Sequence, residues 1–150
     1  MGTPAASYAA DCIRGINFTN VAGALFADYD SVFYVDIATY KFVEYRQSAT
    51  RSHLRNERVG ENFFDAIYGK MEDHIYPDDR ERLKSYIIRK NEIIAGLKYK
   101  AMTILYRLFL DRAIVWCAMK IALTKNGKGL IVGIYSIDEA MKDVKKRILG

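Results

Sequence analysis

Three apolar, strand-like segments in the second half of the chain are joined by links too short for anything but antiparallel pairing. The segments cover residues 99–110, 113–123 and 129–137. Asp111-Arg112 joins the first two, and the second link contains Asn126-Gly127, a dipeptide typical of tight hairpins. Parallel neighbours would need a crossover of about a dozen residues or more. The chain therefore predicts an antiparallel meander, and the rest of the fold has to pack against it.

Both faces of this predicted meander are apolar. Side chains alternate between the two faces of a strand, so one row of each strand can form a core beneath helices. The opposite rows still carry large apolar residues, and a sheet face of this kind is not left bare to water. We expect the N-terminal segment or a second copy of the chain to cover it, which makes a homodimer the expected assembly. The residues on that face are Leu105, Phe109, Ile114 and Trp116.

The sequence before the meander mixes helical and strand-like patterns. Apolar residues at helical spacing predict helices, and short β-rich runs predict strands. One polar stretch that is short of apolar anchors predicts a loop. In chain order, the predicted elements are a helical flank at 1–27, a hairpin of strands at 31–37 and 42–46, a loop at 48–60, and helices at 61–73 and 78–95.

The junction YPDDRERL, residues 76–83, has two adjacent acids directly after a proline. Pro77 ends any preceding helix, and Asp78 is a good N-cap for the next one. Asp79 would then favour the positive end of the helix dipole. The alternative is a metal site formed by both acids and His74. Because capping accounts for both acids without a ligand, we expect no metal.

Composition limits the function classes. At 150 residues the chain has the size of one domain, and a hydrophobic content of 51% is enough for a core. No apolar run is long enough to cross a bilayer, so we expect no direct membrane insertion. The 23 basic residues are scattered and offset by 18 acidic ones, so we expect no nucleic acid partner. Two cysteines without metal-ligand spacing favour a reducing, cytoplasmic setting.

Four motifs, taken in order, resemble a PAS domain, the sensory module of bacterial signalling proteins. They are the junction at 76–83, Tyr106-Arg107 in the ILYRLFL strand, Trp116 in the next strand, and GIYSIDE at 133–139. The stretch at 27–46 resembles PAS modules upstream of GGDEF diguanylate cyclase domains. The resemblance implies an α+β fold, with a five-stranded antiparallel sheet and helices on one face. It also implies an N-terminal helical flank at 1–27, a PAS domain at 28–138, and the start of a C-terminal signalling helix at 139–150.

The resemblance implies a regulatory rather than a catalytic role. We expect a sensory domain that binds a small ligand or dimerises, and that controls a covalently linked effector, such as a diguanylate cyclase or histidine kinase, beyond Gly150. The alternative is a stand-alone small-ligand carrier or an enzyme that uses the same cavity. No catalytic residues are predicted, because no nucleophile comes with a matching histidine and acid.

The identity of any cofactor is unknown from the sequence. Flavin-binding relatives carry an Asn-Cys-Arg-Phe-Leu-Gln motif, which this sequence lacks. Haem-binding relatives carry a histidine on the long helix, and the segment at 78–95 has none. We therefore expect neither flavin nor haem.

Two sets of candidate residues follow. The inner sheet face and the helices would enclose a small apolar pocket, with a filled core as the alternative. Its predicted lining is Phe33, Val35, Phe63, Ile67, Met102, Ile104, Tyr106, Cys117 and Met119. The tail repeats apolar residues at heptad-like spacing, which would let two copies pair and pass a signal onward. The residues predicted for signal transmission or dimer contact are Leu105, Trp116, Ile137, Asp138, Met141, Val144 and Ile148.

Overall fold

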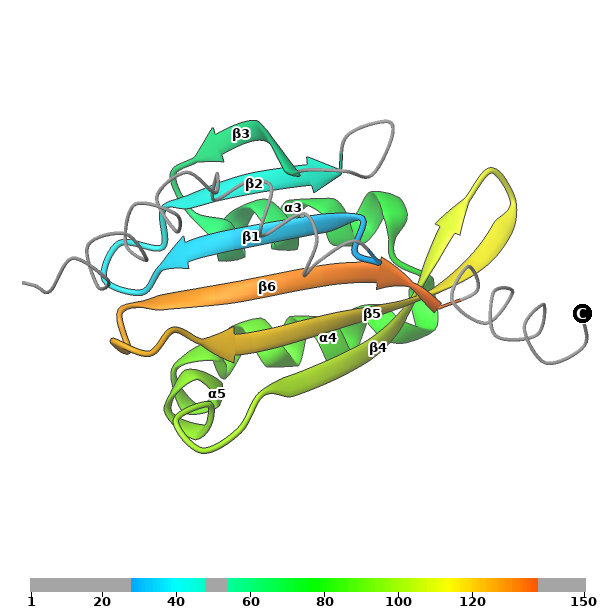
Figure 1. Cartoon of the computed structure of the whole chain (residues 1–150). Helices are drawn as coiled ribbons and strands as arrows, with labels where there is room; N and C mark the ends of the chain where they lie inside the picture. Colours follow the sequence, from blue (N-terminus) through cyan, green and yellow to red (C-terminus); the bar gives the residue numbers. More distant parts are fainter. Residues whose placement is uncertain (1–27, 48–53, 138–150) are drawn as a thin grey trace, which may run out of the picture.

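The computed structural model describes residues 28–47 and 54–137, and for residues 47, 54, 56 and 57 it describes the backbone alone. Within these ranges the chain is an α+β protein with a six-stranded antiparallel sheet and three helices (Figure 1). In chain order the elements are β1 (Ser31–Asp36), β2 (Phe42–Gln47), β3 (Leu54–Gly60), α3 (Phe63–His74), α4 (Pro77–Ile88), α5 (Lys90–Gly96), β4 (Met102–Leu110), β5 (Ala113–Leu123) and β6 (Gly129–Ser136).

The strands lie in the order β3-β2-β1-β6-β5-β4, and all neighbours are antiparallel. The predicted meander is confirmed in β4, β5 and β6, and the predicted hairpin in β1 and β2. The first and last strands meet in the middle of the sheet, where Val32 pairs with Gly133 and Val35 with Leu130. The sheet is therefore completed by two segments from opposite ends of the described chain.

The sheet has six strands rather than the predicted five, because residues 54–60 form β3 instead of a loop. β3 pairs with β2, with a shift of register between Glu44 and Tyr45. Its sequence, LRNERVG, has few apolar residues, so no alternation marked it as a strand. An edge strand needs only one neighbour for its backbone hydrogen bonds, and charged residues on it discourage pairing with other chains. Backbone pairing therefore defines β3. The predicted loop residues 48–53 lie outside the described residues.

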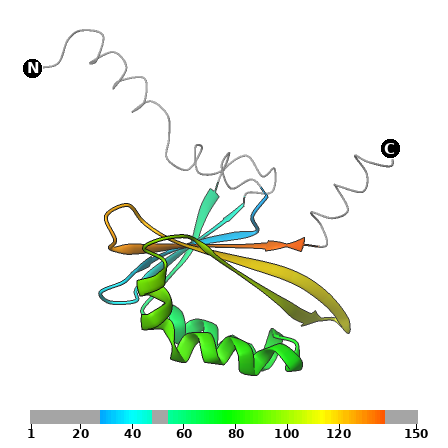
Figure 2. The ribbon, with the colours of Figure 1, turned by 90° about the horizontal axis from the view of Figure 1, so that it is seen from below.

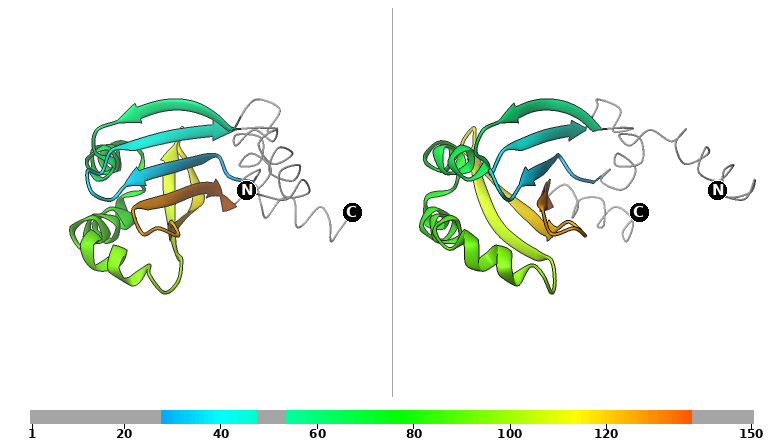
Figure 3. Two further views of the ribbon diagram at one scale, coloured as in Figure 1. Left: turned by 60° about the vertical axis from the view of Figure 1, so that its left-hand side comes forward. Right: turned by 90° about the vertical axis from the view of Figure 1, so that its left-hand side faces the viewer.

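All three helices cover the same face of the sheet, as Figures 2 and 3 show. Asn62 caps α3, because its Oδ1 accepts a hydrogen bond of 3.1 Å from the Asp65 backbone N–H. The predicted single helix over 78–95 is wrong, since α4 ends at Ile88 and α5 begins at Lys90. The break leaves Ile88 largely exposed.

The start of α4 also differs from the sequence prediction. Tyr76, rather than Asp78, occupies the N-cap position, without a side-chain capping bond, and Pro77 is the first helical residue. Proline is well suited to that position, because its missing N–H would have no partner inside the helix. Asp78 lies exposed in the first turn, whereas Asp79 is buried against β4.

The core lies between the helices and the inner face of the sheet. One part is aromatic: the ring centroids of Phe33, Phe42 and Phe63 are 5.2–6.0 Å apart. A second part lies under α3 and α4 and contains Met71, Leu83, Ile104, Tyr106 and Cys117. The residues of both parts are buried against the sheet. A cavity nevertheless remains between the sheet and the helices.

Candidate ligand-binding cavity

A cavity of about 400 Å³ lies between the inner face of the sheet and the three helices. This volume falls within the range of about 300–1,000 Å³ that is usual for small-molecule sites. Among the nine predicted lining residues, the structure brings six to the cavity wall: Phe33, Phe63, Ile67, Ile104, Tyr106 and Met119. The other three, Val35, Met102 and Cys117, pack in the surrounding core.

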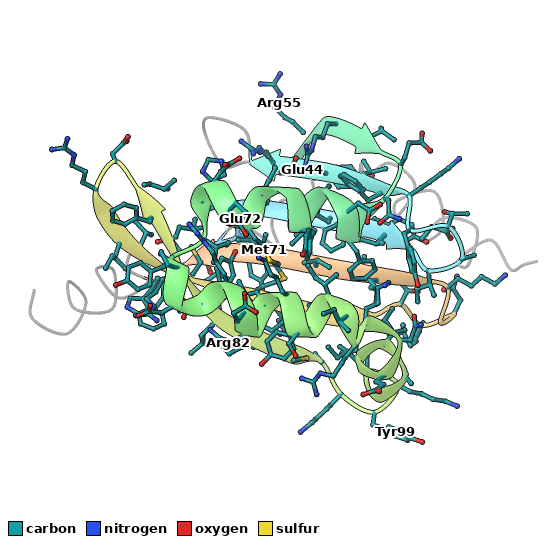
Figure 4. The ribbon with its side chains drawn as sticks, turned by 180° about the vertical axis from the view of Figure 1, so that it is seen from behind. Glu44, Arg55, Met71, Glu72, Arg82 and Tyr99 are labelled. Carbon is teal, nitrogen blue, oxygen red and sulfur yellow. The ribbon has the colours of Figure 1, made fainter. Side chains whose placement is uncertain are left out.

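Most of the wall is apolar and comes from every layer of the fold. Met71 reaches into the space between α3 and α4, as Figure 4 shows. The break between α4 and α5 matters here, because Ile93 and Ile94 of α5 also line the cavity. A wall of this kind favours a ligand with an apolar body, because binding removes the apolar surface of the ligand from water.

One end of the cavity is charged, which the sequence analysis missed. Glu44 of β2 has a side chain only 4% exposed, and its two carboxylate oxygens accept hydrogen bonds from Arg46 Nε at 3.2 Å and Arg58 Nε at 2.9 Å. Figure 4 shows Glu44 beside α3, on the side towards β3. The pairing satisfies a buried carboxylate that would otherwise be costly. Arg58 lies on β3, so the prediction of a loop at 48–60 hid this group.

Lys70 of α3 adds a third cation to this end of the cavity. Burial and then the positive charge of Arg58 lower the pKa of Lys70, against a smaller opposing effect of Glu44. Lys70 makes no ion pair with any residue in the described ranges. We call Glu44, Arg46, Arg58 and Lys70 the cationic end of the cavity.

Tyr106 is another buried residue of the cavity wall with a polar group. Its side chain is 4% exposed, and its hydroxyl makes no hydrogen bond within residues 28–47 and 54–137. Burial, assisted by Cys117 and Asp30, raises the pKa of Tyr106, so the phenol remains a neutral donor at physiological pH. A buried hydroxyl without a partner is unusual and costs free energy.

A second polar group lies at the edge of the sheet, where Asp79 joins α4 to Arg107 of β4. The Asp79 carboxylate accepts three hydrogen bonds from Arg107: 2.8 Å from the backbone N–H, 3.0 Å from Nε and 2.7 Å from Nη2. The hydrogen bonds from the Arg107 side chain lower the pKa of Asp79. The Tyr76 N–H also donates to the Arg107 carbonyl, at 2.9 Å. The backbone N–H and C=O of Arg107, which face away from β5 at the outer edge of β4, therefore both have hydrogen-bond partners.

The guanidinium of Arg107 also lies against two aromatic rings. Its Cζ is 4.5 Å from the centroid of the Tyr76 ring and 5.0 Å from that of Trp116. Such contacts favour a cation over the ring face. One sequence feature points to this arrangement: Arg107 is the single charged residue in the apolar run ILYRLFL. An arginine in such a strand needs a partner, so an acidic or aromatic neighbour is expected.

The outer face of the sheet retains the apolar residues expected there. Leu105, Phe109, Ile114 and Trp116 are each 41–50% exposed in the single chain. Ile137, directly after β6, is partly buried. Asp138, Met141, Val144 and Ile148 lie outside the described residues, as does the predicted flank at 1–27.

The described residues contain no group of three or more His, Cys, Asp and Glu side chains that could hold a metal ion. No helix in the described ranges has the length and apolar character needed to cross a membrane. Comparison of the chain with protein-family models, curated proteins and solved structures found no match. The cavity is therefore the candidate functional site of the described residues.

Proposed function

We propose that this chain is a PAS-like cytoplasmic sensory domain that binds a small ligand between its sheet and helices and regulates an attached effector. The cavity of about 400 Å³ carries this proposal. A domain of this size could have filled the space with side chains, as tightly packed cores do. Keeping an apolar cavity with one charged end instead favours binding of an amphipathic molecule.

The arrangement of the sheet supports the proposal. Apart from the edge strand β3, five antiparallel strands form a continuous sheet with all helices on one face. The resemblance to PAS domains implies five strands with helices on one face, and the sixth strand, β3, departs from that expectation.

The position of β6 supports a regulatory output. β6 lies in the middle of the sheet, and its side chains Leu130 and Ile134 line the cavity. Its end is tied to the start of β1, because the Ser136 N–H donates to Asp30 Oδ2 at 3.1 Å. A ligand that favours one position of β6 would therefore bias the chain that follows it, provided its affinity differs between the two positions.

Native mass spectrometry of the freshly purified protein tests ligand binding. We expect a retained small molecule, or uptake of apolar acids supplied at micromolar concentration. Ala66→Phe should abolish this uptake, because Ala66 lines the cavity and a phenyl ring would occupy it. Ala95→Phe is the matched control, since Ala95 is exposed on α5 and does not line the cavity. Equal uptake by both variants would contradict binding in the cavity.

Regulation needs a separate experiment. With a diguanylate cyclase or histidine kinase joined after Gly150, ligand should change the effector's activity, and Ala66→Phe should remove the change. A ligand that binds without altering the activity of any attached effector would favour the alternative, a stand-alone carrier. Turnover of the bound ligand would instead favour an enzyme.

We further propose that the outer face of the sheet joins two copies of the chain. Its exposed apolar residues are Leu105, Phe109, Ile114 and Trp116. Ile114→Glu should then shift the protein from dimer to monomer in light scattering. Ile88→Glu places the same charge on an exposed helical site and should leave the dimer intact. A wild-type monomer at all concentrations would refute this interface.

A further inference from the structure

The cationic end of the cavity has more positive than negative charge. Three cationic side chains, Arg46, Arg58 and Lys70, surround the single carboxylate of Glu44, and all four line the cavity. Burial lowers the pKa of Lys70 most, and the positive charges of Arg58 and Arg46 lower it further. An added anion would relieve the repulsion between like charges.

Glu44 orients the two arginines without using all their donors. Each arginine bonds Glu44 through Nε, and neither forms a hydrogen bond through its Nη nitrogens with any residue in the described ranges. A guanidinium presents several N–H donors in a fixed fork that matches a carboxylate. The Nη groups of Arg46 and Arg58 therefore remain available beside a lysine.

The ordinary explanation is a set of basic side chains that simply point into water. Lys70 and the two arginines are indeed exposed, with 56% of the Arg46 side chain and 41% of the Arg58 side chain accessible to water. Two observations argue for a ligand instead. Glu44 is almost fully buried and holds both arginines at the cavity wall. The hydroxyl of Tyr106 is buried at the same cavity without a partner in the described part of the chain.

Strand register places these groups near one end of the sheet. Arg46 pairs with Ser31, the first residue of β1, and Ser31 also lines the cavity. Asp30 precedes Ser31 and lies close enough to Tyr106 for its charge to contribute to the raised pKa of that phenol. Tyr106 belongs to β4, at the sheet edge opposite β3, and it pairs with Cys117, which pairs in turn with Ser136, the residue that bonds Asp30 beside the start of β1.

We propose that the cavity binds a small organic carboxylate, with its apolar body between sheet and helices and its carboxylate against Arg46, Arg58 and Lys70. The Tyr106 hydroxyl donates a hydrogen bond to a polar atom of this ligand. The proposal rests on the proposed ligand-binding function and specifies the chemical class of the ligand. A neutral apolar molecule would leave Lys70, the Nη groups of the arginines and the Tyr106 phenol without a partner among the described residues, and an amine would be repelled.

Calorimetric titration with three probes of equal chain length tests the proposal: decanoate, decanol and decylamine. We expect decanoate to bind most tightly, and its affinity to fall as salt is added, because partly exposed charges are screened. Lys70→Glu should weaken decanoate binding by about tenfold or more, since it replaces attraction with repulsion. It should weaken decanol binding little.

Lys98→Glu is the matched control. It changes the net charge equally, but Lys98 is exposed and lies outside the cavity wall. Within the described residues Lys70 forms no ion pair with Glu44, whose ion pairs are with Arg46 and Arg58.

The possible outcomes separate the two proposals. Equal binding of decanoate and decanol, with no difference between Lys70→Glu and Lys98→Glu, would overturn the carboxylate assignment and leave the ligand cavity standing. Failure of all three probes to bind would count against both the carboxylate assignment and the proposed function.

Discussion

The link between Asp79 and Arg107 should contribute a large share of the stability of this domain. Asp79 is 5% exposed and accepts three hydrogen bonds from Arg107. Asp79→Ala leaves the Arg107 N–H without its acceptor and separates α4 from β4. Breaking a buried ion pair from one side costs about 3–5 kcal/mol. Because Arg107 can partly turn to water, we expect a loss of about 2–4 kcal/mol in unfolding free energy.

Urea unfolding of the purified protein measures this loss, and Asp78→Ala is the control. Asp78 is the neighbouring acid in the same helical turn, but it is exposed and its removal should cost only about 0.3–1 kcal/mol. The single tryptophan, Trp116, lies against Arg107, so its fluorescence should respond to Asp79→Ala and not to Asp78→Ala. Equal losses in the two variants would refute the assigned role of Asp79.

The pH dependence supplies a second check. The pKa of Asp79 is lower in the folded protein than in the unfolded chain, so the folded state favours the ionised carboxylate. The stabilisation is complete above the unfolded pKa of about 4 and disappears as the pH falls through the lower folded value. The difference between wild type and Asp79→Ala should therefore be constant above about pH 5 and narrow as the pH falls below about 4. A difference that stays constant below about pH 4 would contradict the argument.

Three further changes should alter stability in predictable directions. Asp111 and Arg112 both have positive φ, 48° and 65°, so Arg112→Gly should stabilise the protein by about 0.5–1 kcal/mol in thermal unfolding, and a loss would contradict this. Tyr106→Phe removes a buried hydroxyl without a partner in the described residues and should stabilise the ligand-free protein by about 1 kcal/mol, whereas destabilisation would show that the hydroxyl is satisfied. Gly60→Ala would place a methyl group against the buried Phe42 ring and should cost about 1–3 kcal/mol, and a neutral result in urea unfolding would show that the ring can move.

The sequence was informative where local chemistry determines pairing. The link at 111–112 and the turn with Asn126-Gly127 are too short for any arrangement but antiparallel hairpins, and the structure confirms both. The alternation in β4 likewise placed Ile104 and Tyr106 at the cavity wall. In these cases the two-residue period of a strand is sufficient to identify the inward side.

Prediction failed where distant segments decide the outcome. β3 forms because β2 offers a free edge, and its own sequence shows no apolar alternation. The cationic end was missed for the same reason, since Arg58 meets Glu44 only through that pairing. From its immediate neighbours Asp79 was expected to favour the positive end of the helix dipole, but its partner Arg107 lies on a strand 28 positions away. Local rules describe such residues incompletely, because long-range contacts override local preference.

The central position of β1 and β6 has a consequence for how the molecule forms. Asp30 and Ser136, which bond each other beside these strands, are 106 positions apart in the chain. While the chain is being synthesised, β1 can pair with β2 early but must wait for nearly the whole domain before its other neighbour emerges. Contacts of such large sequence separation slow folding. Until β6 arrives, β1 exposes an unpaired edge, and this interval is when the nascent protein is most prone to aggregate.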